Sequence, residues 1–359
     1  MQMTSQHGRH SNMSNTEQAK NAALWGSQFT DHMVTARYEP EHGWSDLTLT
    51  DYQPLQLDPS TSVLHYGQAI FEGLKAYHQP DGSVSVFRPE QNARRFARSA
   101  ERLAMAVLPE ELFLDSLCVL VNKVRDRVPT QPGESLYLRP LEIATDALLL
   151  TRPSLSYLYI LMASPVADYF QHGVHPVRVW LSTEYSRAMP GGTGSAKCAG
   201  NYAAAMLAQR QGAEYGCDQV VWLDSVEHRY VEEMGGMNLF FVFSGNRLVT
   251  PNLTGTLLPG VTRDSILTLG ADLGLQVEER LIGTDEWEQS VADGSLLEVF
   301  ACGTAAVITP VGEVVHRNGS FTIGDGGSGA LTMKLRETLL GIQQGTIADT
   351  HGWMHRIAQ

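Results

Sequence analysis

The chain has 359 residues, 43% hydrophobic and 18% charged, a balance typical of a globular protein with a large core. Its formal net charge is −13 and no segment concentrates Lys and Arg, so we expect no nucleic acid partner, because a phosphate backbone would be repelled over most of the surface. No apolar run reaches the roughly eighteen residues of a membrane span, so we expect no membrane-spanning segment.

The first half of the sequence predicts strands and two amphipathic helices, one of them opened by Pro89, whose missing N–H does no harm in a first turn. A loop is expected at 146–153 between two strands. In chain order the predicted elements are a strand at 31–38, a hairpin at 76–87, helices from 89 and over 112–127, and strands at 135–141 and 155–163.

The second half predicts a strand at 177–181, a helix at 202–211, strands at 219–223 and 238–243, a helix at 261–270 and a strand at 296–301. Strands and helices interleave without a steady βαβ rhythm, so we predict an α+β fold in two domains. The expected division is a disordered or tag-like tail at 1–20, a small N-terminal α+β domain at 21–170, a linker at 171–176 and a large C-terminal domain at 177–359.

The four cysteines, Cys118, Cys198, Cys217 and Cys302, show no metal-ligand spacing. At this chain length a disulfide framework is not needed, so free thiols in a reducing compartment are expected. The polar residues 1–20 lack the apolar core of a signal peptide. The sequence therefore predicts a cytoplasmic protein without a metal site.

Residues 191–197, GGTGSAK, form a glycine-rich run that ends in Lys197. A nucleotide P-loop needs Gly directly before the lysine and Ser or Thr after it, but Ala196 and Cys198 stand there. The dinucleotide fingerprint also fails, because Lys197 occupies the place of its third glycine. A lysine among small residues can be desolvated and become nucleophilic toward an aldehyde. The alternative is a solvated lysine in a flexible loop, which the spacing alone favours.

Adjacent acids, Glu232 and Glu233, precede small residues and an apolar strand. One side of such a segment faces the interior, so one carboxylate is expected to be partly buried and to need a cationic or donor partner. A protonated pyridine nitrogen would serve, and protonation makes such a ring a better electron sink. The alternative is a solvated pair of acids at a strand edge.

Two further segments suit an anion. Pro259-Gly260 precedes a helix, which leaves the N–H groups of Val261 and Thr262 to bind an anion that the helix dipole favours. After an apolar strand, residues 303–306 combine glycine, a hydroxyl and small side chains, and suit a phosphate or carboxylate held by backbone N–H groups. The alternatives are a self-capped helix start and a simple turn.

Together and in this order, these segments resemble one family. HYGQAIFEGLKAY, SLYLRP, GGTGSAKCAGNY, EEMGGMN, LPGVTR and CGTAAVI are similar to the successive motifs of the branched-chain amino acid aminotransferases, pyridoxal-phosphate enzymes of fold type IV. The resemblance covers about residues 29–310. It implies a two-domain α+β fold, pyridoxal 5′-phosphate as cofactor, amino and 2-oxo acids as partners, and at least a homodimer, in which the 146–153 loop closes over the partner subunit's site.

The resemblance also assigns cofactor contacts. Lys197 would bind the cofactor covalently, and Tyr202 would hydrogen-bond its phenolic oxygen. Glu233 rather than Glu232 would pair with the pyridine nitrogen, because it immediately precedes Met-Gly. Only the family spacing Asn92-x-x-Arg95 selects Arg95, since its neighbours at 94, 98 and 102 form a stripe typical of a solvated helix face. The other contacts, mostly with the phosphate, would come from Arg95, Leu258, Gly260, Val261, Thr262 and Thr304.

The family's substrate contacts imply an aromatic wall, although such aromatics are more often ordinary core. Arg139 would bind the side-chain carboxylate of glutamate, and the backbone of Thr304 and Ala305, with Tyr66, would bind the α-carboxylate. Gly236 replaces a hydroxyl residue of some relatives, and Ala306 and Thr309 replace a redox cysteine pair. The residues of the wall would be Phe29, Tyr66, Phe71, Tyr137 and Tyr169.

The function implied is transamination of L-leucine, L-isoleucine and L-valine with 2-oxoglutarate, giving branched-chain 2-oxo acids and L-glutamate, with Lys197 as general base and acid. One alternative with the same fold is a D-amino acid aminotransferase or aminodeoxychorismate lyase, against which SLYLRP and EEMGGMN count. A second is a non-catalytic binding protein, which would be marked by loss of Lys197 or Glu233. A third is a P-loop enzyme, whose required residues are absent.

Overall fold

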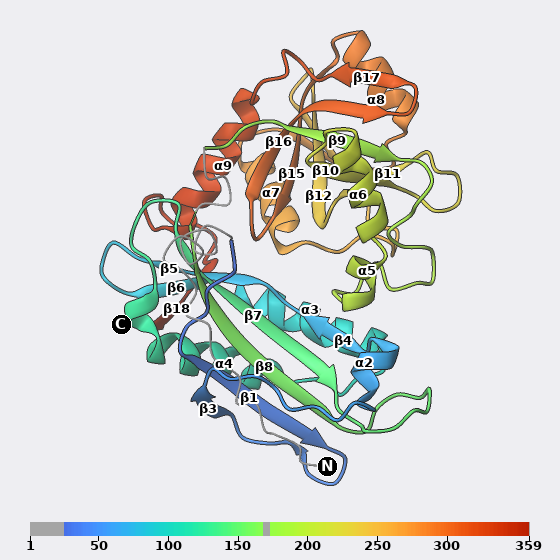
Figure 1. Ribbon diagram of the computed structural model, residues 1–359. Helices are drawn as coiled ribbons and strands as arrows, with labels where there is room; N and C mark the ends of the chain where they lie inside the picture. Colours follow the sequence, from blue (N-terminus) through green and yellow to red (C-terminus); the bar gives the residue numbers. More distant parts are fainter. Residues whose placement is uncertain (1–24, 168–172, 359) are drawn as a thin grey trace, which may run out of the picture.

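Two nine-stranded sheets frame the described residues, 25–167 and 173–358, of the computed structural model (Figure 1). The predicted tail at 1–20, residues 171–172 of the predicted linker and Tyr169 lie outside these residues. One sheet is built mainly from the first half of the chain and the other from the second half. Helix α9 runs from the second sheet towards the first, where the chain ends in β18 (Figure 1).

The first sheet has the order β18-β6-β5-β7-β8-β1-β2, with β3 beside β1 and β4 beside β7. All of these pairs are antiparallel. The strands are β1 (His32–Glu39), β2 (Gly43–Trp44), β3 (Thr48–Asp51), β4 (Ala69–Phe71), β5 (Leu74–His78), β6 (Val84–Phe87), β7 (Ser135–Ala144), β8 (Tyr157–Val166) and β18 (Met354–Ala358).

Alternation along these strands gives the sheet two different faces. Leu136 and Leu138 of β7 point into a large apolar cluster with α3 (Pro89–Arg102) and α4 (Glu110–Lys123). Ile143 belongs instead to a smaller cluster with residues of β1 and β8. The short helices α2 (Ser62–Tyr66) and η1 (Arg125–Arg127) complete this part.

The second sheet has the order β11-β10-β9-β16-β15-β12-β13-β14, and β11 also pairs with β12. That extra pairing closes β11, β10, β9, β16, β15 and β12 into a six-stranded ring, which leaves none of the six with an open edge. The strands are β9 (Val177–Ser182), β10 (Gln219–Leu223), β11 (Val231–Met234), β12 (Met237–Phe243), β13 (Arg247–Thr250), β14 (Gln276–Glu279), β15 (Leu296–Gly303), β16 (Val307–His316) and β17 (Gly319–Thr322).

Helices cover the outside of this ring. Helices α7 (Val261–Asp272) and α9 (Ala330–Gln343) share an apolar cluster with β12 and β15, and α6 (Met206–Glu214) packs Ala208 against Trp180 and Trp222. The remaining helices are α5 (Ala199–Ala203) and α8 (Thr284–Ala292). Among the described residues, none of the helices has both the length and the apolar character needed to cross a lipid bilayer.

The predicted α+β fold is confirmed, and most predicted elements lie within a few residues of their observed bounds. The single helix predicted over 202–211 is wrong: α5 ends at Ala203 and α6 begins at Met206, because α5 is tied to the lysine-bearing loop whereas α6 packs on β9 and β10. The expected two-domain division stays a prediction. Residues 354–358, assigned to the C-terminal domain in that division, pair with β6 of the first sheet.

Candidate active site

The backbone around Lys197 is fixed where the two sheets meet. The amide of Phe71 in β4 donates to the Lys197 carbonyl (3.0 Å), and the Ser99 hydroxyl of α3 accepts from the Lys197 amide (3.0 Å). Gly194 approaches the backbone of Thr256 so closely that an added Cβ would clash with its carbonyl oxygen. Gly194 is therefore needed for this close backbone contact, and the alternative of a flexible loop is not supported.

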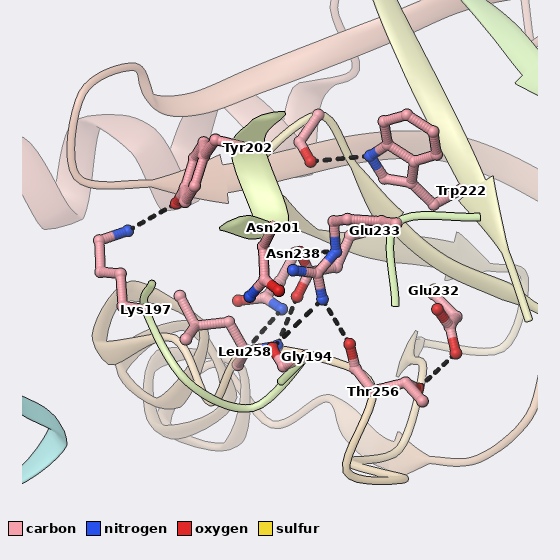
Figure 2. Close-up of polar contacts among 12 residues, drawn as sticks. Gly194, Lys197, Asn201, Tyr202, Trp222, Glu232, Glu233, Asn238, Thr256 and Leu258 are labelled. Carbon is pink, nitrogen blue, oxygen red and sulfur yellow. Dashed lines mark hydrogen bonds and ion pairs between the residues drawn. The ribbon is translucent and has the colours of Figure 1, made fainter. Parts of the chain in front are cut away.

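The Lys197 side chain is half-buried and directed at an aromatic pair. Its Nζ donates to the Tyr202 hydroxyl at 3.0 Å (Figure 2) and lies 5.0 Å from the centre of the Phe71 ring. The Phe71 and Tyr202 rings are 4.9 Å apart. The amine is thus held beside a hydroxyl group by residues of β4 and α5.

Glu233 lies on β11 with its side chain only 2% exposed. One oxygen accepts from the Leu258 amide at 2.5 Å (Figure 2), and the other lies 3.2 Å from Nε of Arg187, which is 7% exposed. Burial raises the pKa of the Glu233 carboxyl above its ordinary value, and the charge of Arg187 and the Leu258 N–H offset this only in part. Lys197 and Arg95 also lower this pKa, so both lie within electrostatic range of Glu233.

Glu232 faces the other way, as expected for successive residues of a strand. It accepts a hydrogen bond from the Thr256 hydroxyl, and burial raises the pKa of its carboxyl as well. Both acids are therefore buried, whereas the sequence analysis expected this of one. The alternative of a solvated pair of acids is excluded.

The predicted anion site lies at the start of α7. Gly260 is the N-cap residue, and Val261, Thr262, Gly303 and Thr304 line one small cavity together with residues of β5. Two segments that are far apart in the sequence are thereby brought together. A helix N-terminus and a turn that face one cavity can both offer N–H groups to an anion.

Arg95 is buried, unlike its exposed neighbour Arg94, and its Nη1 donates to the Pro259 carbonyl just before the start of α7 (3.2 Å). Its other nitrogens donate to both oxygens of Glu72, at 2.7 and 2.8 Å. Asn92 also donates to Glu72. Burial by itself raises the pKa of Glu72, but Arg95 and Asn92 bring it below its ordinary value.

The predicted substrate residues are only partly brought together. Nη2 of Arg139 donates to the Tyr137 hydroxyl at 2.8 Å, and its Cζ lies 4.8 Å from the centre of the Phe71 ring. These three residues therefore lie together, and Phe71 adjoins Lys197. Phe29 instead stacks on Tyr52, and Tyr66 is exposed. The backbone carbonyl of Ala305 accepts a hydrogen bond from the Lys75 side chain. The role expected of each stays a prediction.

Sequence reasoning missed several residues that hold the site. Arg187 and Glu72 are each one member of a buried ion pair whose partner is distant in the chain, so spacing gave no signal for them. Asn238, within EEMGGMN, donates to the Leu258 carbonyl at 3.1 Å, while Glu233 holds the amide of the same residue. Only that motif could have indicated Asn238.

A cavity of about 230 Å³ lies between the buried Glu233 carboxylate and the Tyr202 side chain. A larger cavity of about 630 Å³, lined by residues of β1 and the 53–58 segment, contains none of the predicted site residues. The smaller one is the better candidate because it has the buried carboxylate and the tyrosine in its wall. Its lining is Arg187, Ala196, Asn201, Tyr202, Ala205, Gln209, Gln219, Glu233, Gly235, Gly236 and Leu258.

Comparisons with known proteins show the family of the chain. The profile of the family described as amino-transferase class IV matches residues 69–314. The branched-chain-amino-acid aminotransferase of Mycolicibacterium smegmatis is 60% identical over 337 residues, which are 93% of this chain and 92% of that protein. The chain belongs to the branched-chain-amino-acid aminotransferases. The family member of Mycobacterium tuberculosis (strain H37Rv) is 56% identical with the same coverage, and branched-chain-amino-acid transaminase 1 of Bacillus subtilis is 48% identical over 92% of both chains.

Solved structures of branched-chain aminotransferases share the fold. The Escherichia coli enzyme matches with a TM-score of 0.74 at 27% identity, covering 86% of this chain and 97% of that one. The T.th. enzyme complexed with N-(5′-phosphopyridoxyl)-L-glutamate matches with a TM-score of 0.74 at 26% identity, covering 92% of this chain and 100% of that one. The family resemblance and the fold type IV architecture predicted from the sequence are confirmed.

Proposed function

We propose that this aminotransferase moves the amino group of L-leucine, L-isoleucine and L-valine to 2-oxoglutarate, with pyridoxal 5′-phosphate as its cofactor. The products are the branched-chain 2-oxo acids and L-glutamate. The observation that carries the proposal is one cavity lined by the buried Glu233 carboxylate and by Tyr202, whose hydroxyl accepts a hydrogen bond from Lys197 Nζ. The relatives named for this activity support it.

The residues present fit this cofactor. Glu233 is buried with one ion pair and one amide donor, so a further N–H from a pyridinium nitrogen would stabilise its charge. Tyr202 would donate to the phenolic oxygen. The N-terminus of α7, with Thr262 and Thr304, would hold the phosphate, and Arg95 would add positive charge from beside Pro259.

When bound, the cofactor supplies an electron sink for the charge that develops as the substrate loses its α-proton. Lys197 would take that proton on Nζ and return it one step later, as general base and then general acid. The Tyr202 hydroxyl, 3.0 Å away, would keep the amine oriented during both steps. Glu233 would keep the ring nitrogen protonated.

Arg139 would let one pocket accept both aliphatic and acidic side chains. Its Nη2 donates to the Tyr137 hydroxyl and its guanidinium lies over the Phe71 ring, so its positive charge would attract a substrate carboxylate placed beside these rings. Phe71 and Tyr137 beside it would contact an aliphatic side chain. Such apolar contacts discriminate by about 1–3 kcal/mol per methylene.

A homodimer is part of the proposal. Leu149, Leu150 and Leu155, close together in the chain between β7 and β8, are 69%, 59% and 55% exposed. Large apolar side chains gathered on one exposed segment favour contact with another protein surface. Light scattering of the purified protein would test for twice the chain mass. The expected cytoplasmic location stays a prediction, which fractionation of the source cells would test.

The main test is the Lys197→Ala variant. The wild-type protein should absorb visible light after loading with cofactor, and borohydride should make the attachment permanent in a mass spectrum. Lys197→Ala should lose that attachment and nearly all transamination of L-leucine with 2-oxoglutarate. Lys334→Ala removes an exposed lysine of α9 and is the matched control, expected to behave like the wild type.

Turnover by Lys197→Ala at the wild-type rate would disprove the proposed role of this lysine. Comparing L-leucine with D-alanine and aminodeoxychorismate separates the alternatives within the fold. A protein that binds the cofactor but turns over none of these would support the non-catalytic alternative.

A further inference from the structure

The 303–307 turn, which joins β15 to β16, adopts a conformation that its sequence disfavours. Gly303 and Val307 are paired across the two strands, so residues 304–306 form the connection. Val307 has φ of +62°, in the left-handed region, where a β-branched side chain clashes with its own backbone. Residues in such conformations persist only where the surrounding structure holds them, and they cluster at functional sites.

Two buried cations hold this turn by its carbonyl groups. Arg336 of α9 is 4% exposed, and its Nη1 donates to the carbonyl oxygens of Ala306 (2.6 Å) and Ile308 (3.0 Å). These two carbonyls flank Val307. Lys75 of β5 donates to the Ala305 carbonyl at 2.8 Å. Hydrogen bonds from charged donors are about twice as strong as those between neutral groups.

Holding the carbonyl groups also sets the direction of the N–H groups. Each carbonyl lies in one plane with the N–H of the next residue and points the opposite way. With the carbonyls of Ala305 and Ala306 bonded to Lys75 and Arg336, the short turn has little freedom left. The N–H groups set in this way are those of Ala306 and Val307, which follow the half-exposed Thr304 and Ala305 in the turn. Thr304 shares a cavity wall with Val261 and Thr262 of α7.

We propose that Arg336 is a positioning residue of the 303–307 turn, whose backbone would bind the substrate carboxylate. By bonding the carbonyls on both sides of Val307, it keeps the strained 303–307 turn in the shape that binds the substrate carboxylate. This inference rests on the proposed function, because the anion concerned is the substrate of that reaction. Arg336 itself reaches the turn from α9 and acts through the backbone.

The first test compares Arg336→Met with Arg336→Lys in the full-length, cofactor-loaded enzyme. The probe is 4-methylpentanoate, a carboxylate shaped like leucine without its amino group, and its binding is measured by titration calorimetry. Arg336→Met should weaken this binding by about tenfold, since small displacements of binding groups have effects of this size or larger. KM for L-leucine and 2-oxoglutarate should rise by a similar factor, with a smaller change in kcat. The affinity of Arg336→Lys for 4-methylpentanoate should lie between those of the wild type and Arg336→Met, because one ammonium group replaces a planar guanidinium with several donors.

The second test separates positioning from simple packing of α9. Glycine adopts positive φ at no steric cost, so Val307→Gly should need less restraint. If Arg336 restrains Val307, then Arg336→Met should weaken 4-methylpentanoate binding less in the Val307→Gly background than in the wild type. An equal loss in both backgrounds would assign Arg336 to packing alone and overturn the proposal. Should Arg336→Met fail to fold by circular dichroism, Arg336→Lys is compared in the same two backgrounds.

The outcomes also separate this inference from the proposed function. A wild-type enzyme that neither binds 4-methylpentanoate nor transaminates L-leucine overturns both. A wild-type enzyme that does both, beside an Arg336→Met variant with the same affinity and the same KM values, overturns only the role of Arg336. Weakened binding that Val307→Gly partly relieves supports the proposal.

Discussion

Glu72, which lies between β4 and β5 and pairs with Arg95 of α3, and Glu142, in the core of the first sheet, are both completely buried. Glu72 accepts hydrogen bonds from both sides of the Arg95 guanidinium, from Asn92 and from the Gly73 amide. Glu142 lies on β7, and neither of its oxygens has a hydrogen-bond partner in the described structure. A buried carboxyl group is therefore fully hydrogen-bonded in one region and has no hydrogen-bond partner among the described residues in the other.

The difference shows that partners, rather than burial, decide whether a buried acid is charged. Burial raises the pKa of both carboxyls, but in Glu72 the charge of Arg95 and the hydrogen bonds reverse the shift. In Glu142 nothing opposes burial, and its pKa is raised well above the ordinary value. Glu233 is intermediate, with partners that offset burial only in part. The acid whose pKa is lowered lies beside the proposed site, and the acid whose pKa rises with nothing to oppose burial lies in the core.

Glu72→Gln should have the largest effect on stability, because it leaves the Arg95 guanidinium buried beside a neutral group. Breaking a buried ion pair in this way destabilises by about 3–5 kcal/mol. Urea unfolding of the cofactor-free protein measures this loss. Addition of pyridoxal phosphate should recover more stability in the variant than in the wild type, since its phosphate would give Arg95 a new anionic partner. Equal recovery in both proteins would contradict a contact between Arg95 and the phosphate.

Glu233→Gln should lower kcat by about a hundredfold, roughly 2.7 kcal/mol, because an amide cannot hold the proton on a pyridine nitrogen. Steady-state kinetics with L-leucine measures the loss. The matched control is Glu232→Gln, which changes the adjacent buried acid on the opposite side of β11. A larger loss in the control than in Glu233→Gln would reverse the assignment of the two acids.

The sequence indicates site residues that lie in local motifs, but it does not indicate the partners that they find in distant segments. Lys197 and Glu233 each lie in a short motif that resembles the family, and the start of α7 is indicated by Pro259-Gly260. Arg187 and Glu72 could not be found, because an ion pair between distant segments leaves no local pattern. Most strands and helices were predictable from period and propensity, but the strand predicted at 135–141 stopped just before Glu142. That strand was predicted from β-propensity and length, which do not carry it past an acid, whereas β7 continues to Ala144.

Replacing Glu142 by methionine should stabilise the protein. An unpartnered polar group in an apolar core costs about 1–3 kcal/mol, and a methionine of similar length fills the same space without that cost. The gain in the free energy of unfolding is measured in urea at pH 7. Glu142→Gln is the control: it keeps the shape and a polar group, so it should gain little. A destabilised Glu142→Met would mean that the carboxyl has a partner after all.

The pH dependence of the same variant gives the finest test. A carboxyl with a higher pKa in the folded than in the unfolded protein binds more protons when folded, so its contribution to stability falls as pH rises above the ordinary value of 4.5. The stability advantage of Glu142→Met over the wild type should therefore grow with pH, by at most about 1.4 kcal/mol per unit, until the folded pKa is passed. Glu72 acts in the opposite direction, since its lowered pKa adds stability that is lost as pH falls, but it is present in both proteins and cancels in the difference. An advantage that stays constant from pH 5 to pH 8 would show that Glu142 does not change its protonation on unfolding, and the contrast between the two acids would fail.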